Sequence, residues 1–317
     1  MRGLIHSNRA RIAIAMLACT ASASVAAREA DIFWRNAETG QNVIWQSGLR
    51  LAQQVRASVP DANWQVVGTL DTASGGGAGL VWRHRTAGLN AIWFAGTADY
   101  AFDLATVANQ AWVVAGTGDF DMDGGADLLW HNQSTGRSTI WRQGLARYQI
   151  PLATVTDAAW TIVGVGDFDG DQRADIVWRN TRTGRNAIWP SGQAVLARNL
   201  ASVTNQAWSV AGVGDFDGDM HDDLLWRNIA TGRNAIWRSA DVTMQLAVAA
   251  VPDLSWRVAG VGDFNGDAID DVLWRHEVSG RNVIWRSANA AIQQGVASAG
   301  PAWRVVAVAD FDGIWDY

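Results

Sequence analysis

The stretch GVGDFDGDQRADIVWRNTRTGRNAIW, from Gly164 to Trp189, decides how the rest of the chain is read. Four aspartates, at positions 167, 169, 171 and 175, fall within nine residues, and like charges held this close repel one another. The residues on either side are rich in Val, Ile and Trp, which is typical of β-strands. The stretch therefore predicts an acidic turn between two strands, followed by a glycine-bearing hairpin into a third.

Tryptophan shows that this unit is repeated, because three series of tryptophans recur at intervals of 48 residues. The first series is Trp34, Trp82, Trp130, Trp178, Trp226 and Trp274; the second is Trp45, Trp93, Trp141, Trp189, Trp237 and Trp285; the third is Trp64, Trp112, Trp160, Trp208, Trp256 and Trp303, the last one residue early. Together they hold 18 of the 19 tryptophans, so tryptophan is a scaffold residue here. The period is close to the roughly 40 to 50 residues of known propeller blades.

Each repeat carries four strand signals. In the fifth repeat they are Trp208–Gly214, Asp223–Asn228, Arg233–Arg238 and a weaker one within Met244–Val251. The second strand is apolar on both faces, as expected of a sheet packed between neighbours. We therefore predict an all-β protein, a β-propeller of four-stranded antiparallel blades. Six repeats favour six blades, with seven as the alternative.

The two ends of the chain are expected to complete one blade together. The chain starts with a second strand at Asp31–Trp34 and ends with a first strand at Trp303–Val308, and pairing them would remove two free edges. Residues 28–317 would then form a single propeller domain. The same register places Asp31 beside Asp312 in a split acidic loop. Ile314 replaces a carboxylate in that loop, so weak or absent metal binding is expected there.

Four repeats carry the pattern Asp-x-Asp/Asn-x-Asp-x-x-x-Asp, which predicts calcium sites. Alternating carboxylates in a tight loop can point inward together, and calcium takes about six to eight oxygen ligands in flexible geometry. The residue at loop position 7 varies, which suits a ligand from its backbone carbonyl. The predicted ligands, at positions 1, 3, 5, 7 and 9, are Asp119, Asp121, Asp123, Gly125 and Asp127; Asp167, Asp169, Asp171, Arg173 and Asp175; Asp215, Asp217, Asp219, His221 and Asp223; and Asp263, Asn265, Asp267, Ile269 and Asp271.

Alternatives to calcium account for these loops less well. Aspartate favours turns by bonding its own backbone, but four such turns in register favour about four calcium ions. Magnesium demands strict octahedral geometry, and an EF-hand would need flanking helices and a glutamate at position 12. In the second repeat Asp71 is followed by Ala73, Gly75 and Gly79, so no metal is expected there.

The loop and its flanking strands resemble a known repeat family. GDFDGDQRADIVW resembles the FG-GAP or VCBS-type repeat of integrin α-subunit propellers and of many secreted bacterial proteins, and WRNxxTGRNAIW is similar to its tryptophan-rich bacterial branch. The resemblance covers about Asp31 to Asp312 and implies a propeller with calcium between the first two strands of a blade. The family's glycine at position 6 is present only as Gly124, and integrin propellers have seven blades.

The N-terminus resembles an export signal, in which arginines precede an apolar run that ends in a small-x-small site at Val25–Ala27. We therefore expect residues 1–27 to be a signal peptide and the protein to be secreted, periplasmic or on a bacterial cell surface. A buried N-terminal helix is the alternative. The formal charge of −6 argues against nucleic acid as a partner, and no segment predicts a membrane span.

Two classes of function remain open. The first is a monomeric, calcium-dependent binding or adhesion module for a glycan or an extracellular protein. The second is an exported hydrolase or lyase acting on polysaccharide, although no nucleophile motif and no catalytic residue can be named. Five histidines share no metal-ligand spacing. Arginines directly follow five of the first-series tryptophans, and stacking between blades accounts for them better than ligand binding does.

Overall fold

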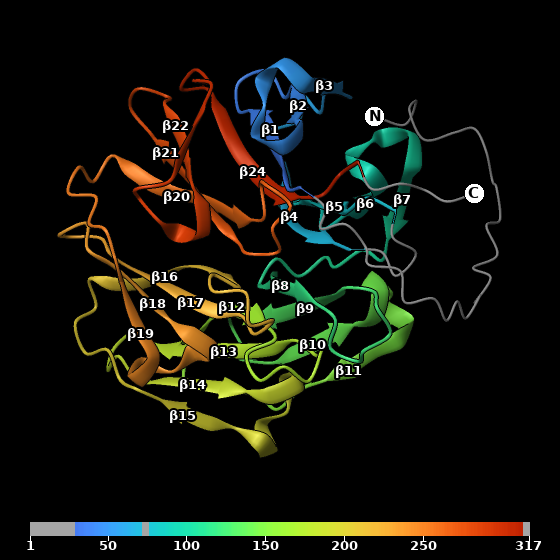
Figure 1. Ribbon diagram of the computed structural model, residues 1–317. Coiled ribbons are helices and arrows are strands. Elements are labelled where there is room, and N and C mark those ends of the chain that lie inside the picture. The colour runs from blue at the N-terminus through green and yellow to red at the C-terminus, as the bar shows by residue number, and fades with distance from the viewer. Residues whose placement is uncertain (1–28, 72–75, 313–317) are drawn as a thin grey trace, which may run out of the picture.

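The structure is a computed structural model that describes residues 29–71 and 76–312. Its strands form six four-stranded antiparallel sheets arranged as blades around a ring (Figure 1). The predicted all-β propeller, with six blades and not seven, is confirmed. The expected signal peptide and the residues Ile314 and Tyr317 lie outside the described residues. Within the described part, no helix is long and apolar enough to cross a membrane.

Each blade is an antiparallel meander in which sequence order runs from the centre of the ring outward. The innermost strands are β4 (Trp64–Leu70), β8 (Trp112–Gly118), β12 (Trp160–Gly166), β16 (Trp208–Gly214), β20 (Trp256–Gly262) and β24 (Trp303–Ala309). The second strands are β1 (Asp31–Asn36), β5 (Gly79–His84), β9 (Asp127–Asn132), β13 (Asp175–Asn180), β17 (Asp223–Asn228) and β21 (Asp271–His276). Innermost strands of neighbouring blades contact one another all the way round, which closes the ring.

The outer half of each blade is shorter and more exposed. The third strands are β2 (Asn42–Trp45), β6 (Asn90–Trp93), β10 (Ser138–Trp141), β14 (Asn186–Trp189), β18 (Asn234–Trp237) and β22 (Asn282–Trp285). The outermost strands are β3 (Gln53–Arg56), β7 (Ala101–Leu104), β11 (Gln149–Pro151), β15 (Arg198–Leu200), β19 (Gln245–Val248) and β23 (Gln293–Val296). The weak fourth-strand signal within Met244–Val251 therefore corresponds to a real strand.

Short 3₁₀ turns join the third strand to the outermost one. They are η1 (Gln46–Gly48), η2 (Arg50–Ala52), η3 (Phe94–Gly96), η4 (Ala98–Tyr100), η5 (Arg142–Gly144), η6 (Ala146–Tyr148), η7 (Pro190–Gly192), η8 (Ala194–Leu196), η9 (Arg238–Ala240), η10 (Val242–Met244) and η11 (Arg286–Ala288). The middle residue of the first turn in every blade has a left-handed backbone, as in Ser191 with φ 47°. This conformation aims the backbone N–H of that residue at the acidic loop of its own blade, as described below.

The seams between blades are filled by tryptophan and arginine. All six first-series tryptophans are at most 2% exposed, and five arginines from second strands stack on the tryptophan of the next blade, as Arg275 does on Trp34 with its Cζ 5.0 Å from the ring centroid. The same guanidinium groups donate hydrogen bonds to carbonyls of the link that precedes the next first strand, such as Val203 and Trp208 for Arg179. The predicted structural role of the tryptophan–arginine pairs is confirmed.

The remaining first-series tryptophan, Trp178, receives a histidine. His131 replaces arginine in the third blade, and its ring meets Trp178 edge to face with centroids 5.6 Å apart. Its Nδ1 lies 2.9 Å from the Oγ of Ser138, which stands where the other five blades have asparagine. Burial lowers the pKa of His131, so this seam carries no charge at neutral pH.

Backbone hydrogen bonds also tie each blade to the next. The N–H at position 8 of each acidic loop, the residue just before the second strand, donates to the carbonyl at position 1 of the preceding blade's loop. The six bonds are Ala30 to Asp263, Ala78 to Asp310, Ala126 to Asp71, Ala174 to Asp119, Asp222 to Asp167 and Asp270 to Asp215, with N···O distances of 2.5 to 3.0 Å. The loops therefore form one continuous ring at one end of the propeller.

Candidate functional site

The acidic loops connect the first strand of a blade to the second, so the last aspartate of each loop opens a buried strand. Asp127, Asp175, Asp223 and Asp271 are 0% exposed. One carboxylate oxygen of Asp175 accepts a bond from the N–H of Phe168 at 3.1 Å, and the other accepts one from the N–H of Ser191 at 2.7 Å. Position 9 thereby ties the loop to the first 3₁₀ turn in each of these blades.

Burial raises the pKa of these carboxyl groups, because a charge is poorly solvated inside the sheet. The pKa of Asp175 rises to about 7 and that of Asp127 and Asp223 to about 6, although the backbone bonds partly oppose the shift. The pKa of Asp271 is also raised, with Arg286 among the groups that oppose the rise. These aspartates therefore need a proton or a cation nearby.

The aspartate at position 1 organises the loop backbone. Asp167 accepts the N–H of Gly170 on one oxygen and the N–H of Gln172 on the other, each at 2.8 Å. Positions 4 and 6 are left-handed in all four loops, and each loop has one glycine and one larger residue at these two positions, such as Gly170 and Gln172. The residues Gln172, Met220 and Ala268 therefore keep the backbone shape that glycine would give at position 6.

Position 3 behaves differently, since its carboxylate does not serve the loop backbone. The Asp121 side chain is 10% exposed and neither of its oxygens accepts a hydrogen bond, although it forms an ion pair with Arg142. One oxygen of Asp217 likewise has no hydrogen-bond partner, while the other accepts from Arg238 at 3.0 Å. Burial and neighbouring carboxylates raise the pKa of Asp121.

The structure brings positions 1, 3 and 9 together in three of the four predicted loops. Their ligand atoms lie within 4.8 Å of one another in the groups Asp119, Asp121 and Asp127; Asp167, Asp169 and Asp175; and Asp215, Asp217 and Asp223. Each group offers three carboxylate oxygens from one loop and one strand. This set of hard oxygen donors suits calcium.

The predicted ligands at position 5 are not part of these groups. Asp123, Asp171, Asp219 and Asp267 each accept the N–H of the position 7 residue, at 2.9 to 3.0 Å. Gln143 and Ser191, from the first 3₁₀ turn, donate to Asp123 and Asp171 in addition. The position 7 residues Gly125, Arg173, His221 and Ile269 are thus held in place by position 5.

The fourth loop has only two carboxylates at the three grouped positions. Asn265 stands at position 3, and its amide Nδ2 donates to Asp267 at 2.8 Å. Asp263 and Asp271 keep the hydrogen bonds of positions 1 and 9. Arg286 lies 3.6 Å from Asp271. This loop therefore has the same backbone with one carboxylate fewer.

The split loop at the chain ends assembles as predicted. Asp31, Asp310 and Asp312 form a fourth three-carboxylate group of the same size, so Asp31 does lie near Asp312. Asp31 accepts the N–H of Phe311 at 3.0 Å and that of Ser47 at 2.9 Å, and burial raises its pKa to about 7. In the second repeat, no three-acid group among the described residues contains Asp71; Ala73 and Gly75 lie outside them.

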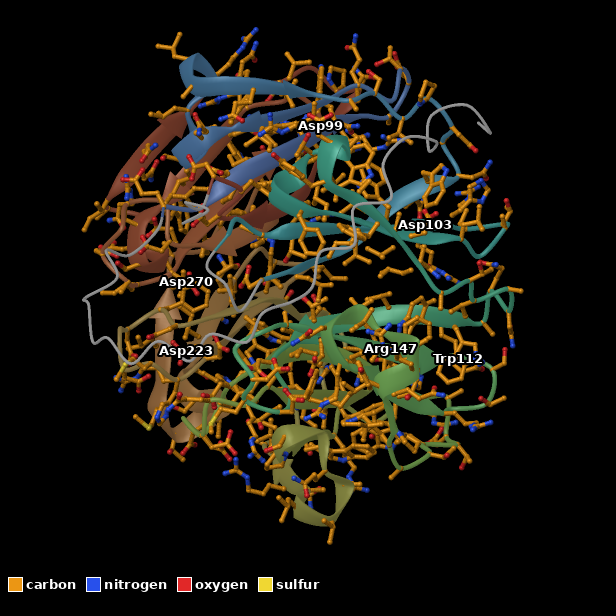
Figure 2. The ribbon with its side chains drawn as sticks, turned by 90° about the vertical axis from the view of Figure 1, so that its right-hand side faces the viewer. Asp99, Asp103, Trp112, Arg147, Asp223 and Asp270 are labelled. Carbon is orange, nitrogen blue, oxygen red and sulfur yellow. The ribbon has the colours of Figure 1, made fainter. Side chains whose placement is uncertain are left out.

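Two features of the loops were not found by sequence reasoning. Arg142, Arg198, Arg238 and Arg286 each pair with an aspartate of one loop. Asp222 and Asp270, at position 8, each accept the backbone N–H of the preceding loop's first aspartate, at 2.7 and 3.0 Å. Figure 2 shows Asp223 and Asp270 on one side of the molecule, away from Trp112. The only sequence signal was an acid at position 8 in two repeats.

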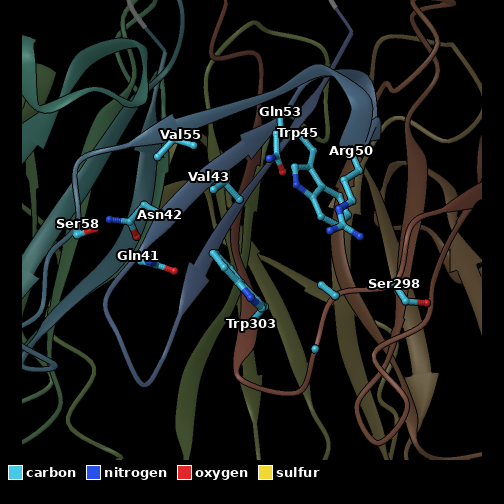
Figure 3. Close-up of a pocket in the computed structure, with 12 residues that line it drawn as sticks. Gln41, Asn42, Val43, Trp45, Arg50, Gln53, Val55, Ser58, Ser298 and Trp303 are labelled. Carbon is cyan, nitrogen blue, oxygen red and sulfur yellow. The ribbon is translucent and has the colours of Figure 1, made fainter.

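Two pockets lie between blades. The first, about 420 Å³, lies against β2 and β3, and its walls include Val43, Trp45, Gln53 and Trp303 (Figure 3). The second, about 500 Å³, is built from repeat-equivalent residues. It lies against β10 and β11, and its lining includes Thr139, Trp141, Gln149 and Trp112. Neither pocket is lined by Asp or Glu.

Comparison with known proteins identifies the fold and no family. No protein-family model and no curated protein matches the chain. Among solved structures, one from a nidogen–laminin complex aligns with a TM-score of 0.58 at 10% identity, covering 88% of this chain and 97% of that chain. A streptogramin B lyase aligns with a TM-score of 0.53 at 8% identity, covering 86% and 80%. Identities this low show a shared β-propeller architecture alone.

Proposed function

We propose that the protein is an exported β-propeller that binds calcium in its acidic loops and acts as a binding module for a glycan or an extracellular protein. The position 3 aspartate carries this proposal. Positions 1 and 9 recur because they bond the backbone, which any aspartate turn could explain. Asp121 has no such task, yet it is buried beside two other carboxylates. Buried charges are ordinarily paired or coordinate metals.

The arginines near the loops supply only part of the required positive charge. The first loop gathers Asp119, Asp121, Asp123 and Asp127, and the ion pair with Arg142 offsets one of these four charges. A divalent cation would offset two more and would let Asp121 and Asp127 stay ionised despite their burial. Asp119, Asp121 and Asp127 would hold the ion, and the carbonyl of Gly125 is the remaining ligand that we propose from this loop.

Calcium fits this donor set better than magnesium. The ligands are carboxylate oxygens on a loop whose shape is already set by position 1, and calcium accepts such flexible, high-coordination sets. Its role would be to stabilise the fold, because an ion that binds the folded loops and not the unfolded chain adds to stability by mass action. This role agrees with the proposed relation to FG-GAP and VCBS-type repeats.

A binding role is favoured over catalysis by the pockets. Similar propellers occur in a nidogen–laminin complex and in a lyase, so the fold itself does not choose between the two classes. The alternative, an exported polysaccharide hydrolase or lyase, calls for acid–base groups in a cleft. The absence of Asp and Glu from both pockets weighs against it. We place the protein outside the cytoplasm, as a monomer, on the basis of its N-terminal segment and closed ring.

Calcium titration tests the proposal. The chain from residue 28 is melted in excess calcium and in excess chelator, and the bound calcium is counted by calorimetry. We expect about four ions, and each site stabilises the fold by about 2.7 kcal/mol at a hundredfold excess over its Kd. Magnesium at the same concentration should protect less. Identical melting curves in calcium and chelator would refute the metal sites.

A further inference from the structure

We propose that the two pockets between blades each bind one pyranose ring of a glycan. The inference rests on the proposed binding function and names its ligand class. The two pockets are the same site two repeats apart: Asn42, Val43, Trp45, Gln53 and Val55 correspond to Ser138, Thr139, Trp141, Gln149 and Pro151. Trp303 corresponds to Trp112 in the same way. A site that recurs with its residue types suits a ligand that presents the same group more than once.

Tryptophans give each pocket an aromatic lining. Trp45 is 4% exposed and Trp141 is 7% exposed, while Trp303 and Trp112 are half-buried at the start of a first strand. Figure 3 shows Trp303 across the first pocket from Trp45, with Val43 between them. An indole offers a flat apolar face with one polar edge. The axial C–H groups of a pyranose make such a face on one side of the sugar, and its hydroxyl groups point outward at the rim.

An unpartnered donor lines each pocket. The indole N–H groups of Trp45 and Trp141 are buried and have no hydrogen-bond partner. In the fifth blade the equivalent Trp237 donates its N–H to Gln245, which faces it in the strand register, at 3.1 Å. A buried donor without an acceptor costs about 1–3 kcal/mol, so the first and third blades retain a cost that the fifth has removed.

The glutamines complete a donor and acceptor pair for a sugar hydroxyl. Gln53 faces Trp45 and Gln149 faces Trp141 in the same register as the fifth-blade pair, yet neither bonds its tryptophan. A hydroxyl of the ligand can accept the indole N–H and donate to the glutamine oxygen at once. An aromatic or aliphatic peptide side chain could fill the same volume but would leave both groups unpaired. This difference favours a sugar over an apolar peptide.

The charge of the pocket linings narrows the class further. Each lining contains one exposed arginine, Arg50 in the first pocket and Arg137 in the second, and no acid. Neutral and acidic pyranoses are therefore compatible, whereas an amino sugar with a free ammonium group is disfavoured. Because one chain holds two such pockets, a polysaccharide could engage both, and its avidity would exceed the affinity of one ring.

The test uses the chain from residue 28 with calcium, labelled with ¹⁵N at its indoles and titrated with methyl pyranosides of glucose, galactose, mannose, fucose, N-acetylglucosamine and glucuronic acid. We expect at least one glycoside to shift the indole signals of both Trp45 and Trp141. Gln53→Ala should weaken the response of Trp45 about tenfold and leave that of Trp141 unchanged. Gln149→Ala should do the reverse. Gln245→Ala, the matched control in the fifth blade, should leave both responses intact.

The outcomes separate this inference from the proposed function. If no glycoside shifts either indole at about 10 mM while calcium still raises the melting temperature, the pyranose sites are refuted and the calcium loops stand. If the indoles respond but calcium has no effect on melting, the metal sites fail alone. A shift at Trp45 that persists in Gln53→Ala would also overturn the proposed geometry. Melting curves of each variant confirm that it is folded.

Discussion

The closing blade and an interior blade are built from the same contacts, although only one of them is continuous in sequence. In the interior blade, Asp175 pairs with Gly166 and Trp178 with Ile162, with an irregularity in the register before Trp178. In the closing blade, Asp31 pairs with Ala309 and Trp34 with Val305, and the register shifts at the same point.

The position 9 aspartate makes the comparison sharper. Asp175 bonds the N–H of Phe168, seven residues away, and Asp31 bonds that of Phe311, 280 residues away, at nearly the same distance of 3.1 and 3.0 Å. The covalent loop is therefore not what positions these groups. Strand pairing and the packing of neighbouring blades do so, and the loop adds its carboxylates to a frame that already exists.

Deleting residues 303–317 should have the largest effect on this equivalence. The deletion removes β24 and exposes the inner edge of β1, and it also removes one link of the hydrogen-bonded ring. We expect the loss of cooperative unfolding, that is, of most of the roughly 5–15 kcal/mol that stabilises a typical domain. Circular dichroism melting measures it. A truncated chain that melts like the intact one would show that the closing blade is dispensable.

Removal of one position 3 carboxylate compares the loops themselves. Asp169→Ala should lower the bound calcium by one ion and reduce the melting temperature by about 2–4 °C for each kcal/mol lost. Asp312→Ala, at the same position of the split loop, should leave the count unchanged because Ile314 stands at position 5. Asp71→Ala, in the second repeat, should not change the count either.

The counts are measured by calorimetry on matched samples. Should Asp312→Ala lose an ion, position 5 would be unnecessary and the closing blade would be a full metal site. Equal losses for Asp169→Ala and Asp71→Ala would instead contradict the assignment of the second loop.

A smaller effect is expected from pH. Burial raises the pKa of Asp31 and Asp175 to about 7, above the value near 3.9 of an unfolded aspartate. Folding therefore favours the protonated form, so in chelator this stabilisation is complete below about pH 4 and is lost as pH rises through about 7. Calcium binds the ionised form and opposes the loss. The difference in melting temperature between calcium and chelator should widen from about pH 5 to about pH 7.5, and a constant difference would contradict the sites.

The smallest expected effect concerns the seam of the third blade. His131 and Ser138 stand where the other blades have an arginine that donates to an asparagine, such as Arg179 to Asn186 at 3.0 Å. The double variant His131→Arg with Ser138→Asn should gain about 1 kcal/mol through stacking on Trp178. His131→Arg alone should gain less, because its new donor lacks an acceptor. Denaturant midpoints of the four proteins give the coupling energy, and strictly additive values would exclude it.

Tryptophan spacing was sufficient to predict the blades, because each series marks the same place in a unit that packs only against its neighbours. The closing pair followed from counting first and second strands. The hairpin turns and the weak outer strand also agree with the structure. Local pattern and global fold agree here because every repeat solves the same packing problem.

The details of the site were less accessible to sequence reasoning. The pattern grouped Asp171 with Asp167 and Asp169, but the backbone turns it toward Arg173 and Ser191. Asp222 makes its bond to another blade, which no spacing within one repeat reveals. The pockets depend on which side chains meet across separate strands and links. These features arise from contacts between repeats, whereas the sequence period describes only what lies within one.

The antiparallel pairing of β1 and β24 also determines how the molecule yields to tension. Asp31 and Ala309 face each other at the end of the ladder from which both chain ends leave. Because antiparallel bonds run across the strands, a pull on the two ends acts along each bond in turn and peels the strands apart, as a zip opens. The first bonds under load are those at Asp31. An ion held by Asp31, Asp310 and Asp312 would be the clasp of that zip.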